Sequence, residues 1–313
     1  MEYKTLGKSG LQVSVTGLGC NNFGMRIDQA QTKVVVDKAI EVGVTLFDTA
    51  NIYGGTKSEE FLGEALGDRR RNIVLATKFG VTIGQGPLNG GGSRRHVTQA
   101  CEDSLRRLKT DWIDLYQYHF RDPKTPVEET LDALNDLVRA GKVRYIGSSN
   151  VTGWMVADDD WTARTSHLTP FVSVQNEYSL LNRDIEKEVV PACKQFGLGV
   201  LPYFPLASGL LTGKYQRGEK PPADTRLQAW GPRGERMLSD ENFDVIDKLE
   251  TFAKERGHTL LDLAFSWLAS KDFVPSVIAG ATKPEQVEAN VKAAEWKLTP
   301  EEMAEVDKIS AHE

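Results

Sequence analysis

Three polar residues stand at or just beyond the ends of short apolar runs. Asp48 and Lys78 close the runs TLFD and IVLATK, and Tyr53 follows Asp48 in the loop TANIYGG. A lysine on an otherwise apolar strand is costly to bury unpaired, so a carboxylate on a neighbouring strand would offset that cost and keep the lysine charged. Tyrosine has a pKa of about 10 in water and becomes a useful proton donor near neutral pH when a nearby cation stabilises its phenolate. We therefore predict that Asp48 and Lys78 pair and tune Tyr53 as a general acid.

His119 ends the run IDLYQYH and completes this set. It is placed to donate a hydrogen bond to the oxygen that Tyr53 would protonate, and so to stabilise the charge that develops there. Such a set suits protonation of an alkoxide as a hydride reaches a carbonyl carbon. Simpler interpretations stay open: a purely structural ion pair, a tyrosine that only packs its ring, and a core histidine. The position of Tyr53 beside the ion pair favours the catalytic interpretation.

The elements that must position these residues alternate between strand-like and helix-like segments. The strand-like runs are 16–19, 45–48, 73–78, 113–119, 143–149, 171–176, 199–203 and 276–280. Between them lie segments of helical period, such as 32–43, where Val35, Val36, Ala39 and Ile40 share one stripe, and 127–141, which ends on a glycine cap. Strand followed by helix, repeated without a linker, predicts a single (β/α)8 barrel over residues 1–313. The carboxyl ends of its strands would share one mouth, where active sites of this architecture lie.

Two segments fall outside this repeat. Residues 3–14 contain a glycine turn between two short alternating runs, which predicts a β-hairpin that caps the floor of the barrel. Residues 207–241 are irregular and rich in Gly, Pro and Arg, and an extra helix-like segment follows at 242–257. Long loops in compact domains usually carry function, so we expect the first of these two stretches to contribute to a binding site.

The composition disfavours several classes of partner. The chain has 38 Lys and Arg residues against 44 Asp and Glu residues, and its net charge of −6 gives no basic field for nucleic acid or anionic lipid. No apolar run approaches the ~18 residues that a membrane helix needs. The N-terminal segment MEYKTLGKSG lacks the basic and apolar pattern of a signal peptide. A soluble cytoplasmic protein is expected.

Cysteine, histidine and glycine patterns give no sign of a metal or phosphate-loop site. The three cysteines are far apart, so neither a disulfide framework nor a CxxC metal site is indicated. The five histidines are scattered, and we predict no metal. The glycine-rich run 84–92 is not followed by GK[ST], so we interpret it as a rim loop and not as a P-loop.

Motifs along the whole chain resemble those of the aldo-keto reductase superfamily. They are DTANIYGGTKSE, ATKFG, YQYH, GSSN, VQNEYS, YFPLASGLLTGKY and IAGATKPEQVEAN, in the family's order. The GLLTGKY motif and short C-terminal tail place the chain nearer the bacterial members and the potassium-channel β-subunits than the mammalian aldose reductases. The resemblance implies a (β/α)8 barrel that binds a nicotinamide cofactor in extended form without a Rossmann domain. In accord with this, the sequence has no strand followed by GxGxxG at the start of a helix.

The resemblance also implies roles by position. Tyr53 would be the general acid, Asp48 and Lys78 would tune it, and His119 would orient the carbonyl. The nicotinamide carboxamide would be held by Ser149, Asn150 and Gln175, with Tyr203 stacked on the ring. The pyrophosphate loop would contribute Leu206, Ser208, Gly209, Lys214 and Arg226. The adenosine end would contact Gly280, Thr282, Gln286 and Asn290.

The cofactor preference rests on a few positions. Phe204 stands where many members have Ser or Thr, Gln286 where many have an Arg for the 2′-phosphate, and Ala289 where an acidic adenine contact is common. Lys214, Arg226 and the helix start after GATKP still offer cationic and amide donors, which favours NADPH/NADP. Phe23 and Trp230 are predicted to contact the substrate, because aromatic residues in strand-exit loops often line such pockets. Trp154 and Trp161 are weaker candidates in loops of the same kind.

The function predicted from these residues is an NADP(H)-dependent oxidoreductase that reduces an aldehyde or ketone to an alcohol, reversibly. A cofactor-binding regulatory module of the channel β-subunit type is the alternative. A Schiff-base lyase that uses Lys78 is a third hypothesis, and borohydride trapping with a carbonyl substrate would detect it. The expected partner is a small-molecule carbonyl compound, and the sequence carries no signal for an oligomeric state.

Overall fold

Eight parallel strands form one curled sheet in the computed structural model, which describes residues 1–86, 88–223 and 225–311. The strands are β3 (Thr16–Gly19), β4 (Leu46–Asp48), β5 (Val74–Phe79), β6 (Ile113–Tyr118), β7 (Val143–Ser149), β8 (Ser173–Gln175), β9 (Gly199–Val200) and β10 (Val277–Gly280). Their order in the sheet is β10-β3-β4-β5-β6-β7-β8-β9. The two ends of the sheet meet where the Ile278 N–H donates to the Pro202 carbonyl, just beyond β9, at 3.2 Å. This architecture confirms the predicted (β/α)8 barrel.

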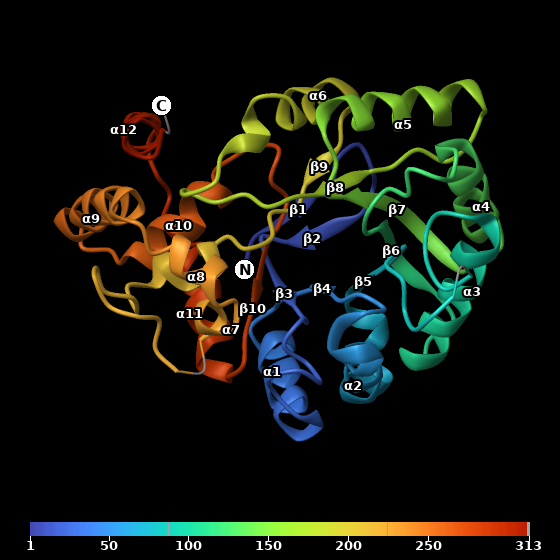
Figure 1. Ribbon diagram of the computed structural model, residues 1–313, viewed down its shortest axis with the longest axis horizontal. Coiled ribbons are helices and arrows are strands. Elements are labelled where there is room, and N and C mark those ends of the chain that lie inside the picture. Colours follow the sequence, from blue (N-terminus) through green and yellow to red (C-terminus); the bar gives the residue numbers. More distant parts are fainter. Residues whose placement is uncertain (87, 224, 312–313) are drawn as a thin grey trace.

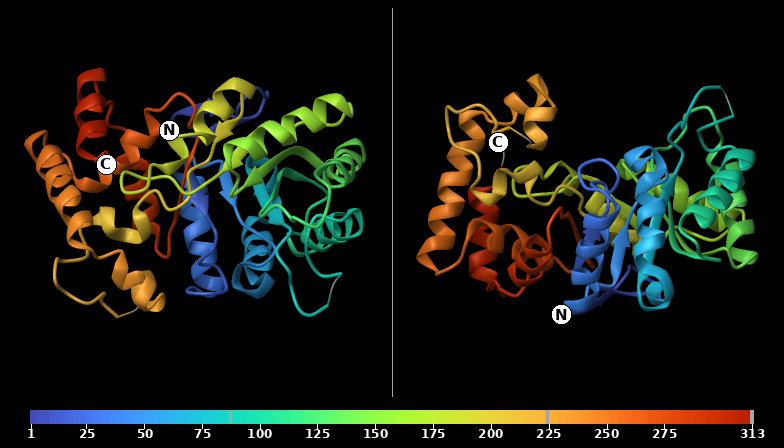
Figure 2. Two further views of the ribbon diagram at one scale, coloured as in Figure 1. Left: turned by 45° about the horizontal axis from the view of Figure 1, so that its top comes forward. Right: turned by 90° about the horizontal axis from the view of Figure 1, so that it is seen from below.

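Helices surround the sheet on its outer side (Figure 1). Those that follow the strands are α1 (Gln29–Glu41), α2 (Lys57–Leu66), α3 (Arg94–Arg107), α4 (Val127–Arg139), α5 (Gly153–Thr165), α6 (Val189–Phe196), α10 (Leu260–Ala269) and α11 (Pro284–Ala293). Outside the repeat lie α7 (Arg226–Ala229), α8 (Pro232–Arg236), α9 (Asp240–Glu255) and α12 (Pro300–Ile309), and short 3-10 helices are η1 (Tyr53–Thr56), η2 (Gly67–Asn72), η3 (Asp184–Glu186) and η4 (Ala207–Thr212). The views in Figure 2 show α9 and α12 on the same side of the molecule as α10. Within the described residues, no helix has the length and apolar character needed to cross a membrane.

Helix α1 illustrates how local sequence sets these elements. Its N-terminus is a capping box, in which the Asp28 side chain accepts from the Gln31 N–H and the Gln31 side chain accepts from the Asp28 N–H. Its buried face contains Val35, Val36 and Ala39, as the periodicity predicts. The cap and the apolar stripe together fix where the helix begins and which face it turns to the sheet.

The N-terminal hairpin closes the lower end of the barrel. Strands β1 (Tyr3–Thr5) and β2 (Gln12–Ser14) pair antiparallel. Leu6 and Val13 have no exposed surface and pack with Leu46, Leu115 and Ile278 from the strands of the barrel. The predicted cap on the floor of the barrel is therefore confirmed.

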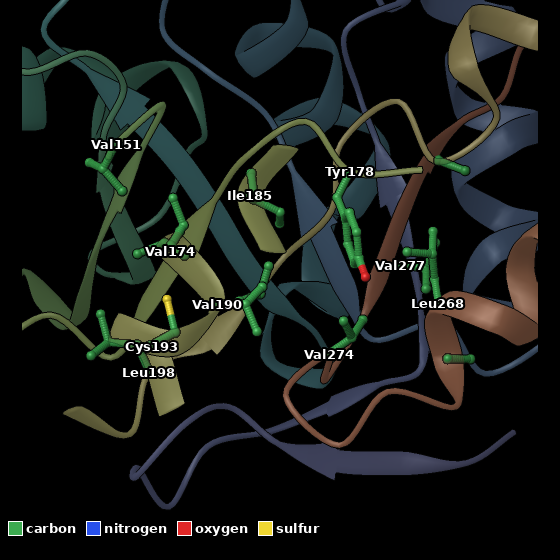
Figure 3. Packing of buried hydrophobic residues seen from close by; sticks show 14 of the residues in the cluster. Val151, Val174, Tyr178, Ile185, Val190, Cys193, Leu198, Leu268, Val274 and Val277 are labelled. Atoms are coloured by element: carbon green, nitrogen blue, oxygen red, sulfur yellow. The ribbon is translucent and has the colours of Figure 1, made fainter. Parts of the chain in front are cut away.

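A larger apolar layer lies between the strands and the outer helices. In Figure 3, Val174 of β8 and Val277 of β10 lie near side chains of α6 and α10, including Val190 and Leu268. Tyr178 is fully buried in the same cluster. Cys20, Cys101 and Cys193 are buried and free. This packing holds the strands at fixed positions, so the residues at their carboxyl ends emerge in a defined arrangement.

Some elements differ from the sequence prediction. Strand β9 ends at Val200 and not at residue 203, because Pro202 has no N–H to continue the ladder. Tyr203 is held instead by an isolated bridge to Glu177. Trp154 and Trp161 do not lie in strand-exit loops. They lie in α5 with 58% and 69% of their surfaces exposed.

Candidate active site

The ammonium group of Lys78 is the centre of the polar cluster at the mouth of the barrel. Lys78 is the residue before the last of β5 and has no exposed surface, and the neighbouring strand β4 ends at Asp48. Its Nζ lies 2.6 Å from Asp48 Oδ2, 2.8 Å from the Thr49 carbonyl oxygen and 3.3 Å from Tyr53 Oη. An ammonium group has three hydrogens, and these contacts use all of them. Because Tyr53 Oη accepts from Lys78, the phenolic O–H is left to donate elsewhere.

Burial keeps Tyr53 protonated, and neighbouring groups keep Lys78 protonated. Burial raises the pKa of Tyr53 above its ordinary value, and the nearby charge of Lys78 only partly opposes that rise. Burial also works against the charged form of Lys78, but the Asp48 carboxylate outweighs it and the pKa of Lys78 is raised. The predicted lowering of the tyrosine pKa is therefore not seen. A Schiff-base mechanism is disfavoured, since it needs a neutral lysine.

Asp48 is held by two amides as well as by Lys78. The Nε2 groups of Gln117 and Gln175 each donate to Asp48 Oδ1 at 2.9 Å. Gln117 is not among the residues predicted from the sequence. Its signal there is its position two residues before His119, because alternate residues of a strand point to the same face.

His119 lies beside Tyr53 at the end of β6. Its backbone N–H donates to the Phe79 carbonyl at 2.9 Å, and its ring stands edge-on to the Tyr53 ring with centroids 5.9 Å apart. Burial, with a further contribution from Lys78, lowers the pKa of His119 to about 3. Its Nδ1 has no hydrogen-bond partner in the part of the chain that the structure describes. A neutral imidazole with an unpaired nitrogen is suited to a polar ligand atom at this place.

We expect His119 to stay neutral between pH 8 and 5. Its pKa of about 3 in the folded protein lies below the ~6.5 of an unfolded histidine, so the unfolded chain takes up this proton first. The free energy of unfolding therefore has its full value, as far as His119 is concerned, above about pH 6.5. It declines as the pH falls from there towards 3. NMR titration of the imidazole signals, assigned with His119→Asn, checks this. A His119 midpoint near 6.5 would contradict the expectation.

Residues predicted to hold the nicotinamide carboxamide form one hydrogen-bonded patch next to His119. The Ser149 hydroxyl donates to the Gln175 carbonyl at 2.7 Å, and Asn150 Nδ2 donates to the His119 carbonyl at 2.9 Å. The Tyr203 hydroxyl donates to Asn150 Oδ1 at 2.8 Å. Asn150 has a φ of 56°, a left-handed conformation that is uncommon outside glycine. The structure thus brings all four predicted residues together.

The loop after β9 forms a cationic turn. Ser208 and Gly209 have φ values of 57° and 100°, and the Lys214 side chain packs so closely on Gly209 that a Cβ there would collide with it. Burial and the positive charges of Arg26 and Arg226 lower the pKa of Lys214, and burial and Arg26 also lower the pKa of Arg226. The buried Ser208 hydroxyl has no partner among the described residues. Converging cations and an unpaired hydroxyl fit the phosphate groups of a dinucleotide.

Leu206 directly precedes η4, at the start of the cationic turn, and is half-buried. Arg26, in the loop after β3, is a further cation that sequence reasoning missed. No motif in the sequence connects Arg26 to the loop after β9. Only the closure of the barrel brings the two loops near each other.

Positions predicted for the adenosine end lie at β10 and α11. Gly280 ends β10, and Asn290 is buried on α11. Gln286 Oε1 accepts from the Thr282 N–H at 2.7 Å and from the Thr282 hydroxyl at 3.2 Å. Gln286 therefore already holds Thr282, another of the residues predicted for the adenosine end.

The two residues predicted to contact substrate have different environments. Phe23 has no exposed surface and packs in the core with Leu18 and Cys20, so the structure leaves it no face for a substrate. The reason is that the chain turns back after β3, where the Gly24 N–H donates to the Ile27 carbonyl at 3.0 Å. Trp230 is half-buried, with its ring 5.6 Å from that of Phe204.

The model of the aldo/keto reductase family matches residues 16–311. The chain belongs to the aldo-keto reductase family. Members of this family are oxidoreductases that act on small carbonyl compounds and generally use NADH or NADPH. The barrel described above is the fold of this family, and the motifs that carry the resemblance lie in the matched region.

Three relatives match this aldo-keto reductase over most of their length. A probable voltage-gated potassium channel subunit beta of Oryza sativa subsp. japonica is 38% identical over 320 residues, covering 99% of this chain and 96% of that protein. A protein of the same name from Arabidopsis thaliana is 36% identical over 318 residues, covering 99% and 96%. Probable aldo-keto reductase 1 of Glycine max is 37% identical over 309 residues, covering 96% and 86%.

Proposed function

We propose that this aldo-keto reductase is an NADP(H)-dependent oxidoreductase that reduces an aldehyde or ketone to an alcohol, reversibly, with Tyr53 as general acid. The observation that carries the proposal is the chain of contacts from Asp48 through Lys78 to Tyr53, 2.6 and 3.3 Å long. It leaves a protonated phenol beside a buried ammonium group at the mouth of the barrel. Family membership supports the reaction class, and these contacts support Tyr53 as the acid.

Each residue of the cluster has a role in this proposal. Bound NADPH supplies a hydride for the carbonyl carbon. Tyr53 gives its proton to the carbonyl oxygen, and Lys78 stabilises the phenolate that this leaves. His119 donates a hydrogen bond to the same oxygen and orients the substrate. In the reverse direction the Tyr53 phenolate takes the proton back from the alcohol.

The residues around this cluster would hold the cofactor. We propose that Ser149, Asn150 and Gln175 bind the carboxamide and that Tyr203 stacks on the nicotinamide ring. The cationic turn would bind the pyrophosphate through Lys214 and the 2′-phosphate through Arg226. The remaining predicted contacts are Leu206, Ser208, Gly209, Gly280, Thr282, Gln286 and Asn290. Trp230 stays the proposed substrate contact.

A direct assay tests the proposed reaction. Purified protein would be mixed with NADPH and a panel of short aldehydes, sugars, steroids and ketones, and the loss of NADPH absorbance would be compared with the alcohol formed. Equal amounts of oxidised cofactor and alcohol support the proposal. Absence of alcohol from every compound in the panel counts against it.

We expect tighter binding of NADPH than of NADH, with Arg226 responsible for much of the difference. One charged contact to a phosphate contributes about 1.5–3 kcal/mol, so Arg226→Ala should weaken NADPH binding by roughly 10- to 100-fold and leave NADH unchanged. Fluorescence titration with both cofactors checks this. Arg233→Ala is the control, because Arg233 lies nearby in α8 but packs over the Trp230 ring at 4.9 Å. Equal loss for both cofactors would overturn the role of Arg226.

The alternative is a cofactor-binding regulatory module. It is supported by the names of the rice and Arabidopsis relatives, each a probable voltage-gated potassium channel subunit beta. A module of this kind would bind NADPH tightly and a partner protein, without measurable carbonyl reduction. Binding of a partner that is unchanged in Tyr53→Phe, together with no turnover in the wild-type protein, would favour it over the enzyme.

A further inference from the structure

Gln117 connects the carboxylate of the candidate site to the residue proposed to hold the nicotinamide. It lies on β6 and has no exposed surface. Its Nε2 donates to Asp48 Oδ1 at 2.9 Å, and its Oε1 accepts from Gln175 Nε2 at 3.3 Å. One side-chain amide therefore contacts both groups, with its donor on one and its acceptor on the other.

The strand register makes room for this arrangement. Lys78 on β5, Gln117 on β6 and Gly147 on β7 are directly paired in neighbouring strands. A Cβ at Gly147 would lie 3.4 Å from Gln117 Cγ and 2.6 Å from Ser173 Oγ. A side chain at residue 147 would therefore collide with Ser173, and glycine lets β7 pack here directly beside Gln117.

Both oxygens of Asp48 accept hydrogen bonds from side chains of the cluster. Its Oδ2 accepts from Lys78, and its Oδ1 accepts from the two glutamine amides. A carboxylate with only donors around it is stabilised in the charged form. Hydrogen bonds to a charged carboxylate are roughly twice as strong as those between neutral groups. The amides of Gln117 and Gln175 therefore each contribute to holding Asp48 in place.

The same contacts fix the orientation of the Gln175 amide. Its Nε2 has two hydrogens, which are directed at Asp48 Oδ1 and Gln117 Oε1. Its Oε1 therefore faces the other way, and no donor within residues 1–86, 88–223 and 225–311 hydrogen-bonds to it. A carbonyl oxygen presented in this way suits the NH₂ of a carboxamide.

We propose that Gln117 is a positioning residue, which holds the Asp48 carboxylate aimed at Lys78 and fixes Gln175 with its oxygen towards the nicotinamide site. The inference rests on the proposed function, because it assumes that Lys78 supports Tyr53 as the acid. Gln117 contacts neither substrate nor cofactor. It acts only through Asp48 and Gln175.

Gln117→Met tests the hydrogen bonds directly. Methionine has a similar length but neither donates to Asp48 nor accepts well from Gln175. Loss of one charge-assisted hydrogen bond at the site should lower kcat by about 10- to 100-fold at every pH, with KM for the carbonyl compound little changed. If kcat per folded molecule equals that of the wild type, the proposal is overturned.

Gln117→Glu adds a readout that a merely structural role would not move. A protonated glutamic acid can still donate to Asp48 and accept from Gln175. Two neighbouring carboxyl groups resist being ionised together, so the pKa of the introduced group should be raised well above its ordinary ~4.3. Turnover of Gln117→Glu should be near the wild-type level at about pH 6. As the pH rises to 9, the introduced group loses its proton, a second negative charge forms, and turnover should fall progressively below that of the wild type. An unchanged pH profile would contradict the proposal.

The surrounding titratable groups make this profile interpretable. They are Asp48, Lys78, Tyr53, His119 and Cys20. The pKa of Lys78 and that of Tyr53 are raised, that of Cys20 is raised well above its ordinary value by burial, and that of His119 is lowered to about 3. A new transition in Gln117→Glu between pH 6 and 9 can therefore be assigned to the introduced carboxyl group.

A binding measurement separates this inference from the proposed function. NADP⁺ and 2′-phospho-ADP-ribose, which lacks nicotinamide, would each be titrated into the wild-type protein and into Gln117→Met. Gln117→Met should weaken NADP⁺ by roughly 3- to 10-fold, because one neutral hydrogen bond that orients Gln175 is lost, and leave 2′-phospho-ADP-ribose unchanged. Failure of the wild type to reduce any carbonyl would refute the proposed function, while this comparison would still test Gln117. Unchanged NADP⁺ affinity in an active protein would refute only the role of Gln117.

If Gln117→Met does not fold, Gln117→Glu at pH 6 and pH 9 supplies the same comparison.

Discussion

Replacing Tyr53 by phenylalanine is expected to lower kcat for aldehyde reduction by at least ~10²–10⁴-fold, as for loss of a positioned general acid. The substitution removes the phenolic oxygen, which lies 3.3 Å from Lys78 Nζ, and leaves the ring in place. Ring packing against His119, the ion pair of Lys78 with Asp48 and the proposed cofactor residues are untouched. The affinity for NADPH and the stability should therefore change little.

Stopped-flow oxidation of bound NADPH by a reactive aldehyde measures this effect. Tyr116→Phe is a matched control, because the Tyr116 hydroxyl is buried without a hydrogen-bond partner in the described chain and its loss should leave kcat unchanged. An aldehyde is the deciding substrate, since a quinone can accept hydride with little help from a proton donor. Comparable single-turnover rates in the wild type and Tyr53→Phe would remove Tyr53 from the mechanism.

Replacing Lys78 by methionine is expected to abolish turnover and to destabilise the fold at the same time. The change leaves the Asp48 carboxylate buried with only the amides of Gln117 and Gln175. Breaking a buried pair by removing one partner usually costs about 3–5 kcal/mol, because an uncompensated charge remains. Activity should fall because no cation stabilises the phenolate of Tyr53 as it forms.

Urea unfolding and kcat, measured on the same preparations, separate the two effects. Adding Asp48→Asn to Lys78→Met removes the unpaired charge, so stability should recover in part while turnover stays lost. Lys33→Met is the control, because Lys33 pairs with Asp37 at the surface, and exposed helix pairs contribute only about 0.3–0.5 kcal/mol. Near-normal turnover in Lys78→Met would show that Lys78 is structural only.

Much of the architecture follows from local pattern. Strands β3 and β7 have the bounds predicted from the sequence, and α1 turns the predicted stripe to the core. These elements are readable because burial repeats with the period of the element itself. The chain alternates strand and helix without interruption, so the barrel and the shared mouth at its strand ends follow as well. The proximity of Asp48, Lys78, Tyr53 and His119 is a consequence of this topology.

The sequence by itself determined the barrel, the family motifs and the set of residues at the strand ends, because each depends on residue type and local period. Only the tertiary structure decided what those residues contact. The hydrogen bonds of Gln117 depend on the register of β6 with its neighbours β5 and β7. Phe23 lies in the core because its loop folds back, and the pKa of Tyr53 is raised because burial outweighs the charge of Lys78. Register, burial and the closure of the sheet depend on contacts between residues that are far apart in the sequence, so no local pattern encodes them.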